Sequence, residues 1–227
     1  VGAGNNGGDT LVALAALAAA GWKALAYLAV PRPREDAYLE RLLAKGGSFA
    51  PVEQDEGFLT LDAWLEEADI LLDGVIGTGL KLPIKPELAR LLDHVSQQAA
   101  LPLVVAVDCP SGVNCETGEA APETIFADLT VCMAAVKTGL LRLPAYGYVG
   151  ELLTVDIGLP DDLSLWKAIN TTVASASDVA ACLPVRPLDA HKGTFGQVLI
   201  AAGSINYTGA ALLAGRAAYQ VGAGLVR

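Results

Sequence analysis

The sequence predicts an α/β fold of three layers, Rossmann-like, around a mostly parallel sheet. Short apolar runs such as 69–76 and 103–107 are typical of strands that are buried on both faces. Segments with helical spacing alternate with these runs, which favours right-handed crossovers and a parallel sheet. The 227 residues are 53% hydrophobic and only 18% charged, so a large core is available.

The first elements follow from glycine and proline positions. Val1–Ala3 has the character of the end of a strand, and the glycine-rich stretch Gly4–Asp9 is expected to form a loop after it. An alanine- and leucine-rich helix follows and stops at Gly21, a good residue for a helix end. A strand at 22–30 and a proline-broken turn at 32–34 come next.

The spacing of apolar residues and the positions of glycine and proline define the next elements. Apolar residues at helical spacing precede Gly46, and proline opens the helix that begins at Pro86. Up to residue 112 we expect helices at 11–20, 35–45, 60–68 and 86–98, and strands at 22–30, 49–52, 69–76 and 103–107.

Beyond Gly112 the pattern changes. Two strands, at 126–135 and 149–157, are separated by a loop and are expected to extend the sheet at one edge. The proline-containing stretch that follows resembles a linker, and one strand (197–202) and one helix (208–221) follow it. Such a β-loop-α unit is too small to bury its own face. The sequence therefore divides into a domain at 1–160, a linker at 161–188 and the start of another domain at 189–227.

Composition excludes several classes of protein. The formal net charge of −10 disfavours binding to nucleic acid. The apolar stretch 11–30 is rich in alanine and divided by Gly21, so we interpret it as a helix and a strand rather than a membrane span. Four cysteines without a C-x-x-C pair favour reduced thiols and a cytoplasmic location. Two histidines make a histidine-based zinc site improbable.

Three loops leave predicted strands at the carboxyl edge of the sheet, where ligands bind in folds of this kind. The first, Gly4–Asp9, feeds a helix N-terminus and suits a phosphate, although it could be an ordinary turn with Asp9 as the cap. The second contains Gly77, Thr78 and Gly79, whose amides could hold another phosphate. The third runs from Asp108 to Gly112.

The polar residues of these loops suggest two chemical roles. Asn6, Asp73 and Ser111 together offer amide, carboxylate and hydroxyl oxygens, the ligands of hard cations. Asp108 leaves a buried strand and is the best-placed acid or base. The alternative is that Asp73 and Asp108 only cap helices or complete turns.

The motifs of these three loops together resemble those of a known family. Gly4-Asn5-Asn6-Gly7-Gly8-Asp9, Asp73 with Gly77-Thr78-Gly79-Leu80, and Val107-Asp108-Cys109-Pro110-Ser111-Gly112 resemble the NAD(P)H-hydrate epimerase family, the YjeF N-terminal domain. Lys137-Thr138-Gly139 and Tyr148–Leu152 match a later segment of that family, so the resemblance covers roughly residues 1–160. Two departures are Thr10, where the family usually has glycine, and the missing helical segments ahead of the first strand.

The last residues carry a second resemblance. His191–Gly196, Leu199–Ser204 and Tyr207–Ala210 are similar to the start of the ADP-dependent NAD(P)H-hydrate dehydratase domain, which is ribokinase-like. The two domains are fused in this order in bifunctional bacterial enzymes of nicotinamide-nucleotide repair. Because only about the first forty residues of the second domain are present, we expect no dehydratase activity from this chain.

The resemblance implies an isomerase that interconverts the R and S forms of hydrated NADH and NADPH, known as NADHX and NADPHX. It implies a small-molecule substrate, potassium as the cation, and no nucleic-acid or membrane partner; a homo-oligomer stays open. Asp108 would be the catalytic acid/base, with Lys137 as a second candidate that could also be a solvated surface lysine. The implied substrate-binding residues are Asn5, Asn6, Gly7, Gly8, Asp9, Gly77, Thr78, Gly79, Leu80 and Asp108, and the implied cation ligands are Asn6, Asp73 and Ser111.

Two other classes of function stay open. Relatives of this domain serve as binding modules, so a non-catalytic nucleotide- or protein-binding domain of the same fold is the alternative. A scaffold needs none of Asn6, Asp73, Asp108 and Ser111, and their joint presence favours the enzyme. A ribokinase-like enzyme, suggested by the last residues, is disfavoured because its catalytic part is missing.

Overall fold

A computed structural model describes residues 1–33, 35–160 and 162–227. Arg34, in the predicted turn, and Asp161, at the start of the predicted linker, lie outside the described residues. The chain forms two compact units, Val1–Leu163 and Ser164–Arg227, and each is described by itself.

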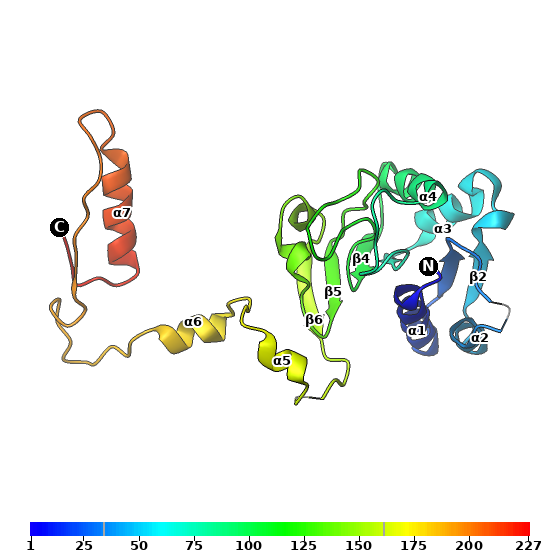
Figure 1. Ribbon diagram of the computed structural model, residues 1–227, viewed down its shortest axis with the longest axis horizontal. Coiled ribbons are helices and arrows are strands. Elements are labelled where there is room, and N and C mark those ends of the chain that lie inside the picture. Colours follow the sequence, from blue (N-terminus) through cyan, green and yellow to red (C-terminus); the bar gives the residue numbers. More distant parts are fainter. Residues whose placement is uncertain (34, 161) are drawn as a thin grey trace. The chain divides into compact units, whose positions relative to one another are not determined.

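The first unit is an α/β domain with parallel strands, so the predicted fold class is confirmed (Figure 1). One sheet has the order β3-β4-β5-β6, and β1 pairs with β2 beside it. Neighbouring strands of the four-stranded sheet and of the β1–β2 pair are all parallel, including the two strands predicted to extend one edge. The strands are β1 (Leu25–Leu28), β2 (Ser48–Pro51), β3 (Ile70–Asp73), β4 (Leu103–Val107), β5 (Leu129–Met133) and β6 (Glu151–Val155).

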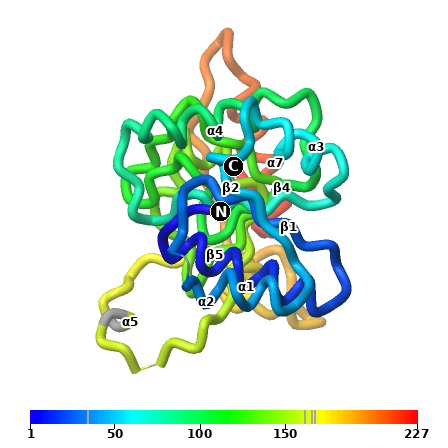
Figure 2. Tube along the Cα trace, turned by 90° about the vertical axis from the view of Figure 1, so that its right-hand side faces the viewer, coloured from blue at the N-terminus to red at the C-terminus, as the bar shows by residue number. Residues whose placement is uncertain are grey.

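Helices cover both faces of the strands. In Figure 2 the strands lie between α1 and α2 on one side and α3 and α4 on the other. Leu71 and Leu72 of β3 show why: Leu71 packs against the core of α3 and α4, and Leu72 against the core of α1 and β1. The helices are α1 (Asn5–Ala19), α2 (Ala37–Ala44), α3 (Leu59–Glu67) and α4 (Pro86–Ser96). Short 3₁₀ turns lie at Val52–Gln54, Glu56–Phe58, Thr138–Leu141 and Ala145–Gly147.

The start of α1 corrects one prediction. The stretch expected to be a loop, Gly4–Asp9, forms the first turns of α1, with Gly4 as the N-cap. Glycine is required inside this helix because a Cβ atom on Gly7 would lie 2.0 Å from the Gly2 carbonyl oxygen. The close approach of α1 to the preceding chain therefore outweighs the low helix propensity of glycine.

Val1 and Gly2 lie between the two groups of strands. The Val1 ammonium group donates to the Tyr27 carbonyl at 2.7 Å, and the Ala29 amide donates to the Val1 carbonyl at 2.9 Å. On the other side, the Gly2 amide donates to the Gly74 carbonyl at 3.0 Å. These two residues therefore bond to both neighbours as the last residues of a central parallel strand would.

The second unit contains α5 (Ser164–Ala168), α6 (Ala176–Cys182), β7 (Gln197–Val198), α7 (Gly209–Gln220) and β8 (Leu225–Val226). The strand predicted at 197–202 is only two residues long, and it pairs in parallel with β8, which the sequence analysis missed. No residue of α7 is buried, although the helix lies where it was predicted. Among the described residues, no helix is long and apolar enough to cross a membrane.

Candidate functional site

A crevice of about 680 Å³ lies at the carboxyl ends of the strands of the first unit. The start of α1, the loop after β3 and the start of α4 form its walls, and Asp108 enters it from the end of β4. Its lining residues are Ala3, Gly4, Asn5, Asn6, Asp9, Val30, Val75, Ile76, Gly77, Thr78, Gly79, Leu80, Lys81, Ile84, Lys85, Leu88 and Asp108.

Asp108 has a left-handed backbone conformation, with φ of 68°. Its amide still donates to the Val131 carbonyl at 2.9 Å, so the residue stays bonded to β5. Its Oδ1 atom accepts from the Met133 amide at 2.9 Å. Aspartate tolerates this conformation better than most residues, and here the bend turns its carboxylate across the end of β5.

Lys137 contacts this carboxylate directly. Its Nζ atom donates to Oδ1 of Asp108, and also to the Met133 carbonyl at 3.1 Å. The side chains of Lys137 and Asp108 are 21% and 16% exposed, so the pair is shielded yet reachable. The two residues named as catalytic candidates from sequence are thus in contact.

Asp73 and Ser111 form a buried polar pair. Oδ2 of Asp73 accepts from the Ser111 amide at 2.7 Å, and Oδ1 accepts from the Ser111 hydroxyl at 2.5 Å. Asp73 is only 3% exposed. Burial raises the pKa of its carboxyl group, and the two hydrogen bonds from Ser111 oppose that shift.

Asn6 approaches the same place. Its Nδ2 atom donates to the Ile76 carbonyl at 3.3 Å, and the Ser111 hydroxyl lies 3.3 Å from that same carbonyl oxygen. Among the described residues, the buried Oδ1 atom of Asn6 has no hydrogen-bond partner. Gly77 is needed here, because a Cβ atom on it would lie 2.9 Å from the Asn6 Cβ atom. The three residues predicted as cation ligands therefore converge around Ile76.

The predicted binding residues divide into two groups. Gly7 and Gly8 do not line the crevice; Gly7 packs against Gly2, and a Cβ atom on Gly8 would lie 3.2 Å from the ring of Tyr38. They were assigned to a loop, and the helix buries them instead. The residues that do line it are Asn5, Asn6, Asp9, Gly77, Thr78, Gly79, Leu80 and Asp108.

Sequence reasoning missed several lining residues. Lys81 and Lys85 bring two ammonium groups to the crevice, and Val30, Ile84 and Leu88 supply apolar surface. The signal was present, since both lysines lie within six residues after Gly79.

Burial raises the pKa of Asp9, and the negative charge of Asp108 adds to the shift.

The fold and the site define a class of protein. This is a Rossmann-like α/β domain whose ligand crevice lies at the carboxyl edge of a parallel sheet, where such folds bind phosphorylated small molecules. The sequence profile described as YjeF-related protein N-terminus matches residues 1–139. The chain belongs to this family.

Curated relatives match almost the whole chain. Bifunctional NAD(P)H-hydrate repair enzymes from Coxiella burnetii and Escherichia coli are each 34% identical, over 99% and 100% of the chain. One from Moorella thermoacetica is 36% identical over 99% of the chain. The chain spans 45%, 42% and 43% of these three relatives, which is less than half of each.

One solved structure supports the fold. The crystal structure of yeast ynu0 superimposes with a TM-score of 0.60 at 19% identity. The match covers 78% of this chain and 73% of the yeast chain. At this identity the likeness supports the fold alone.

Proposed function

We propose that this chain epimerises the hydrates of NADH and NADPH, interconverting their R and S forms. The observation that carries the proposal is the Asp108–Lys137 pair, held at the end of the sheet beside a crevice with two glycine motifs. The family and the names of the full-length relatives support the same substrate class.

The proposed reaction needs one positioned proton carrier. The ring nitrogen of the substrate donates its electron pair, the carbon–oxygen bond breaks, and Asp108 gives a proton to the departing hydroxyl group, which leaves as water. Water then adds to the opposite face of the iminium ion and returns one proton to Asp108. Atoms and charge balance, since one water leaves and one enters.

Lys137 would assist this step by its charge. Its ammonium group contacts the carboxylate in the described structure and would hold it in place beside the reacting oxygen atoms. Because Met133 bonds to both side chains, the pair would keep its geometry while a proton is transferred.

The substrate's phosphates would lie at the other end of the crevice. The N-terminus of α1 and the Gly77–Gly79 amides suit anionic groups, and Lys81 and Lys85 add positive charge.

Potassium fits the converging oxygens of Asn6, Asp73 and Ser111. The orphaned Oδ1 atom of Asn6 and the buried carboxylate of Asp73 are the features that a monovalent cation would satisfy. When bound, the cation supplies a fixed positive charge that stabilises the ionised form of Asp73 and orders the loop after β3.

The test is to incubate the purified chain with one epimer of NADHX and follow the epimer ratio by chromatography. We expect equilibration well above the rate without protein, and its loss in Asp108→Asn. The matched control is Asp93→Asn, on the exposed surface of α4, which should retain the wild-type rate. Tight binding of hydrated NADH without any epimerisation would instead favour the non-catalytic binding module.

Two further properties are part of the same proposal. A cytoplasmic location agrees with four free cysteines. A homo-oligomer stays open, and the molar mass in solution, measured by light scattering, will decide it.

A further inference from the structure

Of the described residues that line the crevice, two are acidic, Asp9 and Asp108. Asp9 belongs to α1, whereas Asp108 enters from the end of β4, so the two carboxyl groups reach the crevice from different elements. Lys81 and Lys85, just ahead of α4, are the other charged residues among the described lining residues. The proposed reaction gives Asp108 a task and leaves Asp9 without one.

In the described helix, Asp9 does not have the capping role that the sequence allowed. Gly4 is the N-cap of α1, and Asp9 lies beyond the first turn. The side chain is exposed toward the crevice, and among the described residues no hydrogen bond or ion pair engages its carboxylate. Asp9 is therefore an unpartnered acid that faces the space for a ligand.

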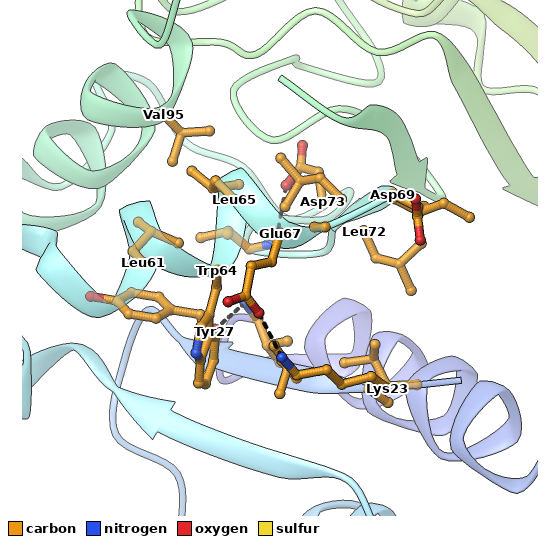
Figure 3. A pocket seen from close by; sticks show the side chains of 18 of the residues that line it. Lys23, Tyr27, Leu61, Trp64, Leu65, Glu67, Asp69, Leu72, Asp73 and Val95 are labelled. Atoms are coloured by element: carbon orange, nitrogen blue, oxygen red, sulfur yellow. Dashed lines mark hydrogen bonds and ion pairs between the residues drawn. The ribbon is translucent and has the colours of Figure 1, made fainter. Parts of the chain in front are cut away.

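Other acidic residues of this unit serve the fold. Asp36 accepts hydrogen bonds from two amides at the start of α2, and Asp55 accepts from two amides at the start of α3. Asp73, which Figure 3 labels at a separate, mainly apolar cavity of about 230 Å³, accepts from the amide and hydroxyl of Ser111. These three carboxylates are occupied, whereas that of Asp9 is available.

The stereochemistry of the proposed reaction requires proton transfer on both faces of the substrate ring. Inversion at the ring carbon means that the hydroxyl group leaves from one face and water enters from the other. A proton carrier acts within hydrogen-bond reach, about 2.6–3.2 Å, so a carboxylate fixed beside one face serves the oxygen on that face. Asp108 is fixed in this way, because Lys137 and the Met133 amide hold its Oδ1 atom.

The electrostatic environment of Asp9 suits a group that carries a proton. Burial raises the pKa of its carboxyl group, and the negative charge of Asp108 adds to the shift. Lys137 contacts Asp108, whereas neither Lys81 nor Lys85 forms an ion pair with Asp9 in the part of the chain that the structure describes. Two carboxyl groups with different partners in one site are a recurring arrangement for acid and base roles.

We infer that Asp9 is a second catalytic residue of this crevice and serves the face of the substrate ring opposite to Asp108; the inference rests on the proposed epimerisation. For one epimer, Asp108 gives its proton to the departing hydroxyl group, and the carbon–oxygen bond breaks as the ring nitrogen forms the iminium ion. Water on the other face then forms the new carbon–oxygen bond and gives one proton to the Asp9 carboxylate.

The step balances in atoms and charge. One water molecule leaves, one enters, and one proton moves from Asp108 to Asp9. For the other epimer the two residues exchange roles, so the reverse reaction, or exchange with solvent, returns that proton to Asp108.

The experiment follows each epimer of NADHX separately in H₂¹⁸O and measures both the epimer ratio and the ¹⁸O content of the starting epimer. Asp9→Asn should lower epimerisation by about 10²–10⁴-fold in both directions. It should still exchange the hydroxyl oxygen of one epimer with solvent, because Asp108 can return water to the face that it left. Asp108→Asn should exchange the opposite epimer alone.

Two controls frame this measurement. Asp93→Asn, on the exposed surface of α4, should epimerise and exchange both epimers like the wild-type chain. A sample without protein gives the background of spontaneous exchange. The pattern separates a catalytic role from a structural one, since a folding or binding defect would suppress exchange of both epimers together.

Two results would overturn the inference and leave the proposed function in place: near-wild-type epimerisation by Asp9→Asn, or loss of exchange in both epimers, which would make Asp9 a binding residue. Absence of epimerisation by the wild-type chain would overturn the proposed function, and this inference with it. If circular dichroism shows that Asp9→Asn does not fold, Asp9→Ala, which favours the helix, decides by the same two measurements.

Discussion

The main chain of Met133 bonds to both members of the Asp108–Lys137 pair: its amide donates to the aspartate, and its carbonyl accepts from the lysine. Met133 is the last residue of β5, inside the sheet. The pair is therefore fixed to the sheet rather than to a mobile loop. A fixed geometry of this kind is what a proton carrier between two oxygens requires.

Asp108→Asn should lower the epimerisation rate by about 10²–10⁴-fold and leave binding within about tenfold of wild type. Asparagine keeps the shape and tolerates the left-handed backbone, but it cannot carry the proton. The two measurements are the rate with one NADHX epimer and the affinity for an unreactive cofactor analogue. A near-normal rate would leave Asp108 only a structural role.

Lys137→Ala should lower the rate by about 10²-fold, because the carboxylate loses its cationic partner. Added ethylamine should restore part of this activity, whereas it should not affect Asp108→Asn. Lys23→Ala, which removes an exposed lysine on the far side of the domain, is the control. If Lys137→Ala behaves like Lys23→Ala, Lys137 is a surface residue after all.

Potassium should raise the thermal midpoint of the chain in a saturable way, since a ligand that binds only the folded state stabilises it. The same concentration of N-methylglucamine chloride should have no such effect. Asp73→Asn and Asn6→Ala should abolish the response, and Asp9→Asn should retain it. In crystals grown with rubidium, density within coordination distance of Asp73 is expected; a water there would contradict the site.

Gly74→Ala should destabilise the fold by about 1–3 kcal/mol, because its Cβ atom would lie 1.8 Å from the Thr10 hydroxyl oxygen. Thr10 is buried and bonds to the Asn6 carbonyl at 2.8 Å. Combining Gly74→Ala with Thr10→Gly should cost at least about 1 kcal/mol less than the sum of the single changes. Additive effects in denaturant unfolding would mean that the two residues are not coupled.

Local patterns predicted most of the fold. The strand at 103–107 lies where the apolar run indicated, and Pro86 opens α4 as expected. The start of α1 was misplaced because glycine and asparagine disfavour helices locally, whereas close packing against Gly2 decides the outcome. The pairing of β1 with β2 and of β3 with β4 could not be predicted, because strand pairing depends on contacts far apart in sequence.

Part of the site could also be predicted from local sequence patterns. Asp108 follows an apolar run, so its place at the carboxyl edge was predicted from the strand pattern. The strand predicted at 69–76 ends already at Asp73, and this puts Asp73 at the same edge. The contact between Lys137 and Asp108 spans 29 residues and depends on the bend after β5. The hydrophobic periodicity of the sequence does not predict such a bend. Lys81 and Lys85 were missed because this stretch was interpreted only from its glycine motif.

Because the strands are parallel, the crevice lies at their carboxyl ends, and among the described residues the opposite edge of the sheet, at their amino ends, is free of site residues. The connections that enter β2 and β4, at 45–47 and 97–102, lie at the amino ends of the strands, opposite the crevice. Insertions there should leave the geometry around Asp108 unchanged. These two loops are thus suitable attachment points for a fluorescent reporter or a tether, because both lie away from the crevice.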